Sequence, residues 1–345
     1  IANLEDAIEK DSFFKIPNVP GFTVIEAGSA SEAMSTSYRT VKGYISASGQ
    51  NHFYMEAQTA IASIVDGNCV DVTCGSQDPA GYQGYVAGVL NYPQNRVIVK
   101  CPRSGGAFGG KITHGIPTAT AAALAATKLK RTVRMFNTRT ADMIMSGGRE
   151  AFSFDYEVGY TADGVITALI LTVYVDAGND KNDAMGGLYM GMNWADNAYY
   201  FPNYTANAKM AYTNTPGRTS MRAPGVVQAC FATESIVERV AYELNLPTYV
   251  VQQRNFIQNG QTTILGQTVT DCTLPTVWNT LIERSHFNNR YNATMQYNAT
   301  NSYRKRGISI VSYIYQYICI WNYYVCMYIC VYVCVYAVHI KVIYI

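Results

Sequence analysis

Two neighbouring stretches of the chain carry the apolar patterns of β-strands. Residues 151–158 alternate apolar and polar side chains, and residues 165–175 form a second run rich in β-branched residues. Between them, Ala162, Asp163 and Gly164 favour a turn. The pattern predicts a hairpin with one buried face.

Three other segments have the apolar spacing or the composition of helices. They are residues 117–130, which are rich in Ala and Leu, residues 226–244 and residues 274–284. Short apolar runs at residues 22–25 and 95–100 are typical of strands. Because strands and helices mix without a regular strand–helix–strand alternation, and no repeat of fold scale is visible, the sequence predicts an α+β fold.

The run from Cys101 to Lys111 directly follows a strand-like segment and places four glycines around Phe108. Glycine lacks a Cβ atom, so such a loop lets backbone N–H groups approach a cofactor or a phosphate closely. The stretch from Gly105 to the lysine matches the phosphate-loop pattern, in which a magnesium-binding Ser or Thr must follow the lysine. Ile112 stands at that position, which disfavours nucleoside triphosphate binding.

Composition and charge narrow the possible functions. Of the 345 residues, 49% are apolar and 14% are charged, and the net charge of +2 gives no reason to expect a nucleic-acid partner. The cysteines of the body are scattered, as in a reduced cytoplasmic protein, and lack the spacing of zinc or redox motifs. We expect no secretory leader, because the first residues lack a positively charged segment followed by an apolar core. With four histidines and no Gly-x-Ser-x-Gly motif, a hydrolase triad is disfavoured, and we expect His52 to be a buried, hydrogen-bonded histidine.

Residues 308–340 are a different kind of sequence. They contain no Asp, Glu, Lys or Arg and consist mostly of Tyr, Ile, Val and Cys. About 20 apolar residues can span a bilayer, but the tyrosines are spread along the stretch instead of gathering at its two ends, so a membrane segment is the less favoured alternative. A repetitive TA/TG-rich nucleotide stretch encodes the same residue types, and we interpret residues 308–345 as a non-native translation.

Four separated segments together resemble one family. In chain order they are Gly-Gln-Asn-His-Phe-Tyr-Met-Glu at 49–56, Gly-Gly-Ala-Phe-Gly-Gly-Lys at 105–111, Ser-Gly-Gly-Arg at 146–149 and Thr-Ser-Met-Arg-Ala-Pro-Gly at 219–225. This order resembles the molybdenum hydroxylases, the xanthine dehydrogenase and aldehyde oxidase family, up to about Gly307. The resemblance implies a partial molybdenum cofactor-binding domain over residues 31–307, with residues 1–30 as the end of a preceding domain and a linker.

The resemblance also implies a bound molybdenum–molybdopterin cofactor. Gln77 is similar to the glutamine that bonds a molybdenum oxygen, Phe108 to the aromatic residue that approaches the metal, and Arg222 to an arginine on the metal's far side. The implied cofactor-binding residues are Gln77, Phe108, Gly109, Ser220, Met221 and Arg222.

Three further positions bear on the implied substrate. Xanthine-oxidising members carry a glutamate directly after the loop's lysine and an arginine upstream of the Tyr-x-x-Pro-Asn segment, whereas this chain has Ile112 and Met190 there. Pro224 replaces a phenylalanine that stacks on purines. An apolar pocket leaves the polar edge of a purine without hydrogen bonds, so the resemblance implies a small-molecule aldehyde as substrate.

The family architecture adds expectations about the rest of the protein. In the family, 2Fe-2S clusters and FAD precede the region that this chain resembles, and the general-base glutamate follows it, so no catalytic base is expected among these residues. A cytoplasmic homodimer is expected from the same resemblance. The alternative is an inactive pseudogene-like product or a membrane-tethered, non-enzymatic module.

Overall fold

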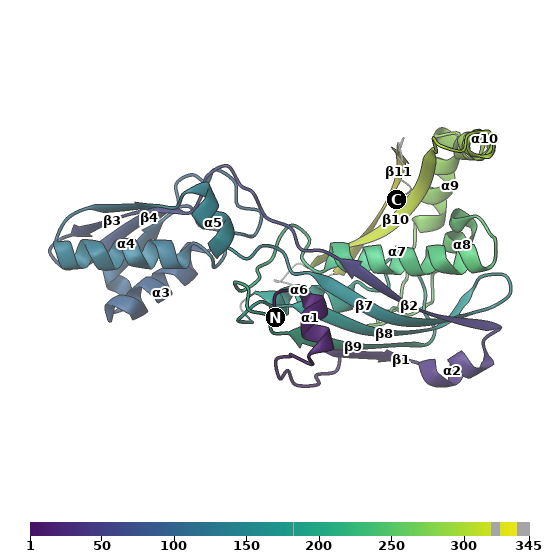
Figure 1. The fold of residues 1–345 in the computed structure, drawn as a ribbon, viewed down its shortest axis with the longest axis horizontal. Helices are drawn as coiled ribbons and strands as arrows, with labels where there is room; N and C mark the ends of the chain where they lie inside the picture. The colour runs from purple at the N-terminus through teal and green to yellow at the C-terminus, as the bar shows by residue number, and fades with distance from the viewer. Residues whose placement is uncertain (182, 319–324, 337–345) are drawn as a thin grey trace.

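The computed structural model describes residues 1–181, 183–318 and 325–336, and it consists of two lobes (Figure 1). The chain leaves the sheet of the large lobe at the end of strand β2 (Arg39–Ala47) and returns to it at the start of β7 (Phe152–Tyr160). Ala47 and Phe152 are paired across these two strands. The small lobe is therefore an insertion, residues 48–151, between the end of β2 and the start of β7, which are adjacent in the sheet.

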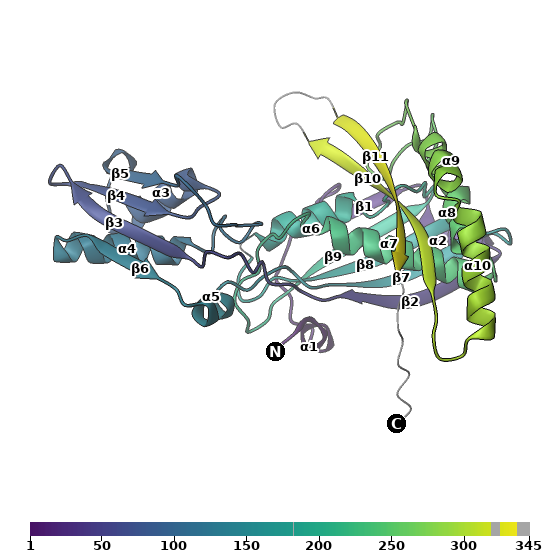
Figure 2. The same cartoon turned by 90° about the horizontal axis from the view of Figure 1, so that it is seen from above.

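The small lobe is a four-stranded sheet with two helices on one face (Figure 2). The strand order is β5-β4-β3-β6, with β4 and β5 parallel and the other neighbours antiparallel. The buried face of helix α4 is made of Ala119, Ala122, Ala123 and Ala126, and such small side chains let a helix lie close to a sheet. The elements of the insertion are β3 (Thr59–Val65), β4 (Cys69–Cys74), α3 (Pro79–Leu90), η1 (Gln94–Arg96), β5 (Val97–Lys100), α4 (Ile116–Leu129), β6 (Val133–Phe136) and, after the sheet, α5 (Arg139–Met145).

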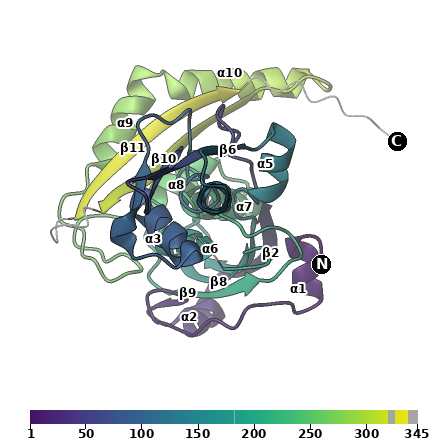
Figure 3. The ribbon, with the colours of Figure 1, turned by 90° about the vertical axis from the view of Figure 1, so that its left-hand side faces the viewer.

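The large lobe is a five-stranded sheet of order β1-β9-β8-β7-β2, in which only β8 and β9 are parallel. Helices α6, α7 and α8 cover one face, and α1 and α2 lie toward the other (Figure 3). Its core buries aromatic side chains such as Phe152, Phe154 and Tyr204 almost completely. The remaining elements are α1 (Leu4–Glu9), β1 (Val24–Ala27), α2 (Ala30–Thr36), β8 (Ile166–Asp176), α6 (Ala184–Asn193), β9 (Tyr204–Ala211), α7 (Val226–Glu243) and α8 (Thr248–Arg254).

The C-terminal part of the chain packs on the large lobe at the end away from the insertion (Figures 1 and 2). It comprises α9 (Leu274–Arg284), α10 (Phe287–Thr300) and an antiparallel hairpin of β10 (Gly307–Ile318) and β11 (Val325–Tyr336). Asn197 donates a hydrogen bond to the backbone oxygen of Ser312 at 3.0 Å, so the start of the hairpin contacts the core. In the described part of the chain, no helix has the length and apolar character needed to cross a membrane.

The predicted α+β fold is confirmed, and so is the hairpin, which is β7 and β8. The expectation that only one face of this hairpin is buried is wrong, because helices lie on both faces of the sheet and Asp155 is the only exposed residue of the two strands. Helices form at all three predicted places: α4, α7 and α9. The interpretation of residues 308–345 as a non-native translation stays a prediction, and its residues 319–324 and 337–345 lie outside the described residues. The boundary at residue 30 also stays a prediction, although β1 already pairs with β9 of the large lobe.

Candidate functional site

Gln77 and the glycine loop start from neighbouring strand ends in the small lobe. Parallel strands β4 and β5 end side by side, with Thr73 paired with Lys100, so the loops that follow them begin next to each other. The Oε1 atom of Gln77 accepts hydrogen bonds from the backbone N–H groups of Gly109 (2.9 Å) and Lys111 (3.3 Å). The backbone N–H of Gln77 in turn donates to the carbonyl of Lys111 at 2.9 Å.

These contacts fix how the amide of Gln77 is oriented. Two N–H donors require an acceptor, so the oxygen must face the loop and the NH₂ group must face away from it. Gln77 is exposed, and among the described residues its Nε2 atom has no hydrogen-bond partner. The NH₂ group of Gln77 is thus a hydrogen-bond donor with a fixed direction beside the glycine loop.

Phe108 is held in an unusual backbone conformation. Its φ of +56° lies in the left-handed region, which costs an ordinary L-residue about 1–2 kcal/mol. Its side chain is nevertheless 46% exposed, so burial of the ring does not account for the conformation. An exposed aromatic residue on a strained loop is typical of a group positioned to face a ligand.

Gly109 brings the glycine loop against a segment of the large lobe. Its φ is +106°, and a Cβ atom at this position would lie 1.9 Å from the carbonyl oxygen of Ser220. The backbone N–H of Arg222 donates to the carbonyl of Phe108 at 3.2 Å, and the Arg222 guanidinium lies 5.9 Å from the centroid of the Phe108 ring. We refer to Gln77, residues 105–111 and residues 219–225 as the cradle.

Other side chains hold the large-lobe half of the cradle. His52, buried as the sequence predicted, donates from Nε2 to the carbonyl of Ser220 at 2.9 Å. A carbonyl oxygen only accepts, so the Nε2 atom must carry a proton. Asp183 accepts from the Ser220 N–H at 3.1 Å, and Arg149 donates to the carbonyl of Arg222 at 2.9 Å. Ser220, its neighbour Met221 and Arg222 are therefore fixed from both sides.

The three residues expected to line a substrate pocket are partly buried; Pro224 belongs to the cradle, and Ile112 and Met190 come from the segments beside it. Ile112 directly follows the glycine loop, and its N–H donates to the carbonyl of Gly109. Met190 lies on α6 beside Gly191, and a Cβ atom on Gly225 would lie 2.5 Å from the Gly191 nitrogen. Pro224 precedes Gly225, so this close approach of α6 brings the segments of Met190 and Pro224 together.

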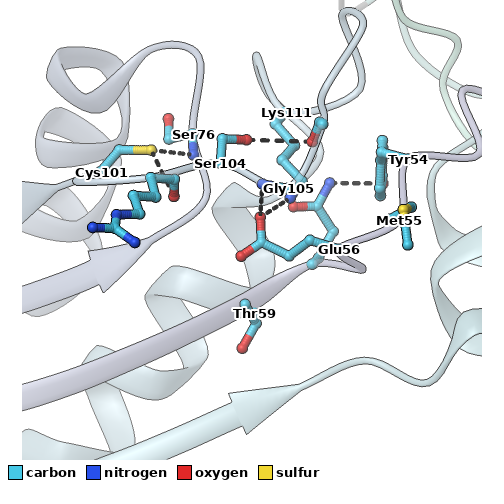
Figure 4. Close-up of polar contacts among 12 residues, drawn as sticks. Tyr54, Met55, Glu56, Thr59, Ser76, Cys101, Ser104, Gly105 and Lys111 are labelled. Atoms are coloured by element: carbon cyan, nitrogen blue, oxygen red, sulfur yellow. Dashed lines mark hydrogen bonds and ion pairs between the residues drawn. The ribbon is translucent and has the colours of Figure 1, made fainter.

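Sequence reasoning missed an ion pair between the buried Lys111 of the cradle and the partly exposed Glu56 (Figure 4). The side chain of Lys111 is fully buried, and its ammonium group lies 2.5 Å from Oε2 of Glu56. The same oxygen accepts from the N–H of Gly105 at 3.0 Å. Burial alone would raise the pKa of Glu56, but these hydrogen bonds and the charge of Lys111 hold that pKa below its ordinary value. The ammonium group of Lys111 is thus paired within the protein. This agrees with the sequence argument that disfavours nucleoside triphosphate binding by this loop.

Glu150 was also missed, and it lies next to the arginine that holds the cradle. Its side chain is fully buried, and neither carboxyl oxygen has a hydrogen-bond partner among the described residues. Burial, reinforced by the charge of Asp183, raises the pKa of Glu150 to about 7. A Cβ atom on Gly187 of α6 would lie 2.5 Å from this carboxyl group, so it packs directly behind that helix.

A cavity of about 180 Å³ lies elsewhere, between α7, α8, α10 and β10. Glu234 lines it and accepts hydrogen bonds from Tyr199, Asn197 and Gln252. No residue of the cradle lines this cavity. The candidate site is therefore the junction of the two lobes.

Comparisons with known proteins agree with this geometry. Residues 15–256 match the model of a family described as the molybdopterin cofactor-binding domain. The chain is 36% identical over 323 residues to aldehyde oxidase 4 of Arabidopsis thaliana and 34% identical over 311 residues to a xanthine dehydrogenase of Dictyostelium discoideum. These matches cover 91% and 90% of this chain but only 24% and 22% of the two relatives.

Solved structures show the same fold. The aldehyde oxidoreductase of Desulfovibrio gigas superposes with a TM-score of 0.74 at 20% identity, over 85% of this chain and 32% of that one. The aldehyde oxidoreductase of Desulfovibrio desulfuricans gives a TM-score of 0.78 at 17% identity, over 91% of this chain and 35% of that one.

Proposed function

Because the chain belongs to the molybdopterin cofactor-binding domain family, we propose that it holds a molybdenum–molybdopterin cofactor at the junction of its two lobes and serves the oxidation of aldehydes. The observation that carries the proposal is the orientation of Gln77, whose Oε1 atom is engaged by the glycine loop while its amide NH₂ faces outward. When bound, the cofactor would supply the oxidation chemistry, and the protein would supply positions and hydrogen bonds.

The residues of the cradle fit such a group in their chemistry. A molybdenum centre with oxygen ligands accepts hydrogen bonds, and the Gln77 amide is a donor that no described residue satisfies. Arg222 is exposed and adds positive charge on the other side of Phe108, which suits the phosphate of a pterin cofactor or an anionic metal centre. The roles of Gln77, Phe108, Gly109, Ser220, Met221 and Arg222 are part of this proposal.

Preference for an aldehyde rests on three positions in or beside the cradle. Ile112, Met190 and Pro224 offer no hydrogen bond from their side chains, so a purine would lose its hydration there without compensation. An aldehyde has a single carbonyl group that needs hydrogen bonds, so it loses less hydration in this pocket than a purine does. The relatives include both aldehyde oxidases and xanthine dehydrogenases, so the side chains of this chain carry the argument.

The chain spans about a quarter of the length of the curated relatives that it matches. We therefore propose a cofactor-holding part of the reaction rather than the complete reaction. The general-base glutamate, the 2Fe-2S clusters and the FAD that the resemblance implies would belong to other parts of such a protein, as would electron transfer. A cytoplasmic homodimer remains an expectation from the same resemblance.

Cofactor content tests the first half of the proposal. The chain would be produced in cells that make molybdopterin, and the purified protein would be assayed for molybdenum by mass spectrometry and for pterin by fluorescence after oxidation. We expect both signals in the wild type and a loss of at least fivefold in Gln77→Ala. Gln94→Ala, which changes an exposed glutamine of the same lobe, should retain them; equal content in all three proteins would contradict the proposal.

Substrate preference tests the second half. In an intact oxidase that contains this chain, kcat/KM for an aromatic aldehyde should exceed that for xanthine. The double variant Ile112→Glu/Met190→Arg should narrow this ratio by at least tenfold, since charged groups would then meet the purine's polar edge. A wild-type preference for xanthine would overturn the assignment.

A further inference from the structure

Two cysteines, Cys74 and Cys101, lie at the ends of the two strands from which Gln77 and the glycine loop start. Strands β4 and β5 are parallel and pair Val70 with Val97 through Thr73 with Lys100. Cys74 is the last residue of β4 and Cys101 follows the last residue of β5, so the same register continued by one residue brings the two cysteines side by side. Neighbouring strands lie about 4.8 Å apart, which falls inside the window of about 4.4–6.8 Å between Cα atoms that a disulfide requires.

Both side chains point to the same face of the sheet. Side chains alternate along a strand, so Cys74 shares the buried face of Val70 and Val72, and Cys101 shares the face of Val97. This is the face that α3 and α4 cover. Both thiols are free in the structure.

The two thiols differ in access. Cys74 is 6% exposed, and burial, followed by the charge of Cys101, raises the pKa of its thiol to about 11. Cys101 is more exposed, and its Sγ atom accepts the N–H of Ser76 at 3.3 Å (Figure 4). Because thiolates are the nucleophiles in thiol chemistry, Cys101 is the first to react and Cys74 the second.

We propose that Cys74 and Cys101 are a redox-modification site that forms a reversible disulfide with a low-molecular-weight disulfide as oxidant. The Cys101 thiol loses its proton and attacks one sulfur of the oxidant, forming a mixed disulfide and releasing the first thiolate. The Cys74 thiol then loses its proton and attacks the Cys101 sulfur, which releases the second thiolate. The protein loses two electrons and two protons, and the oxidant becomes two thiols. This inference does not depend on the proposed function.

The bond has a mechanical consequence for the cradle. The Cβ atoms of side-by-side parallel residues point the same way, so they must approach to about 3.8 Å for the bond to close. This draws the two strand ends together and leaves a strained bond that thiols reduce readily. Gln77 lies three residues beyond Cys74, and the glycine loop starts four residues beyond Cys101, so the movement reaches the hydrogen bonds between them.

Peptide mapping of the purified full chain tests the bond. The reduced protein is equilibrated in buffers of reduced and oxidised glutathione, alkylated and digested for mass spectrometry. We expect a peptide pair joined through Cys74 and Cys101 that disappears as the buffer becomes reducing. Cys69→Ser, at the other end of β4, should keep this cross-link, and Cys74→Val should leave Cys101 as a glutathione adduct. Separate alkylation of both cysteines in the wild type under oxidising conditions would overturn the proposal.

Hydrogen exchange tests the coupling to the cradle. The hydrogen-exchange rates of the amides in residues 103–111 should differ at least threefold between the oxidised and the reduced form. The exchange rates of the amides in β9 should be the same in both forms. A disulfide that forms with no change in residues 103–111 would refute the coupling. Cys74→Val supplies the control, because the same buffers should leave its exchange in this loop unchanged.

Discussion

Replacing Gly109 by Ala tests the contact that joins the two halves of the cradle. The added Cβ would lie 1.9 Å from the carbonyl oxygen of Ser220 and 2.7 Å from its carbonyl carbon, whereas real Cβ atoms essentially never come closer than 3.0 Å. Since both of these neighbours are backbone atoms, the loop and the 219–225 segment must separate by about 1 Å, and no side-chain rotation relieves the overlap.

Two costs add in Gly109→Ala. Alanine at a φ of +106° costs about 1–2 kcal/mol, and forcing packed groups apart costs about 1–3 kcal/mol. We therefore expect the free energy of unfolding to fall by about 2–5 kcal/mol. Gly67→Ala is the matched control, because Gly67 has a φ of +75° in the same lobe and nothing within 4 Å of its would-be Cβ. It should lose only the conformational part, about 1–2 kcal/mol.

Urea denaturation of both variants, followed by circular dichroism, gives the two free energies. Molybdenum content of the variants provides a second measurement, and it should fall in Gly109→Ala, because the backbone N–H of Gly109 anchors the Gln77 amide. Equal destabilisation of the two variants would refute the contact between the loop and Ser220 as a constraint on the structure.

Three other changes have expected outcomes. Glu56→Gln leaves the charge of the fully buried Lys111 without its partner and should destabilise the chain by about 2–4 kcal/mol in urea, with part of this recovered in the double variant Glu56→Gln/Lys111→Met. Burial raises the pKa of Glu150 to about 7, so between about pH 5 and pH 7 the folded chain keeps a proton that the unfolded chain loses. Its contribution to stability falls as the pH rises, and Glu150→Gln should flatten that slope; an unchanged slope would contradict the raised pKa. Gly88→Ala, within α3 and with open space around the new Cβ, should raise the midpoint in urea by an amount equivalent to about 0.5–1 kcal/mol.

The elements that sequence reasoning located are those with strong local patterns. Helix α9 has the predicted bounds because Pro275 lies in its first turn and its apolar residues face one side. Hairpin β7–β8 follows from alternation and from the turn at Gly164. In both cases local sequence and tertiary packing favour the same structure.

Two of the helices that sequence reasoning missed, α3 and α6, are rich in glycine. Helix α3 contains three glycines and has little amphipathic character, yet Asp78 caps its first turn and Tyr82 is fully buried in the small-lobe core. Helix α6 contains Gly187, where a Cβ atom would lie 2.5 Å from the Glu150 carboxyl group, and Gly191, where it would lie 2.8 Å from the Phe152 ring. Tertiary contact overrides the poor helix propensity in each case.

The parts of the candidate site differ in how far sequence could reveal them. The glycine loop was evident from composition, but the role of Gln77 came only from the family resemblance. The ion pair of Lys111 with Glu56 gave no signal, because its partners are 55 residues apart and lysine is almost never fully buried unless it is paired. The residue types of a loop can be inferred from the local sequence, whereas the partners of those residues depend on the tertiary fold.

The cradle depends on the relative position of the lobes more than on either lobe alone. Gln77 and Phe108 come from the small lobe, and Ser220 and Arg222 come from the large lobe. Contacts that join them include Gly109 against Ser220, Phe108 with Arg222, His52 with Ser220, and Arg149 with Arg222. Each lobe has its own hydrophobic core, so these contacts add little to the stability of either core. Changes at the junction should therefore impair cofactor retention before they unfold the chain, whereas cavities made in a core should do the reverse.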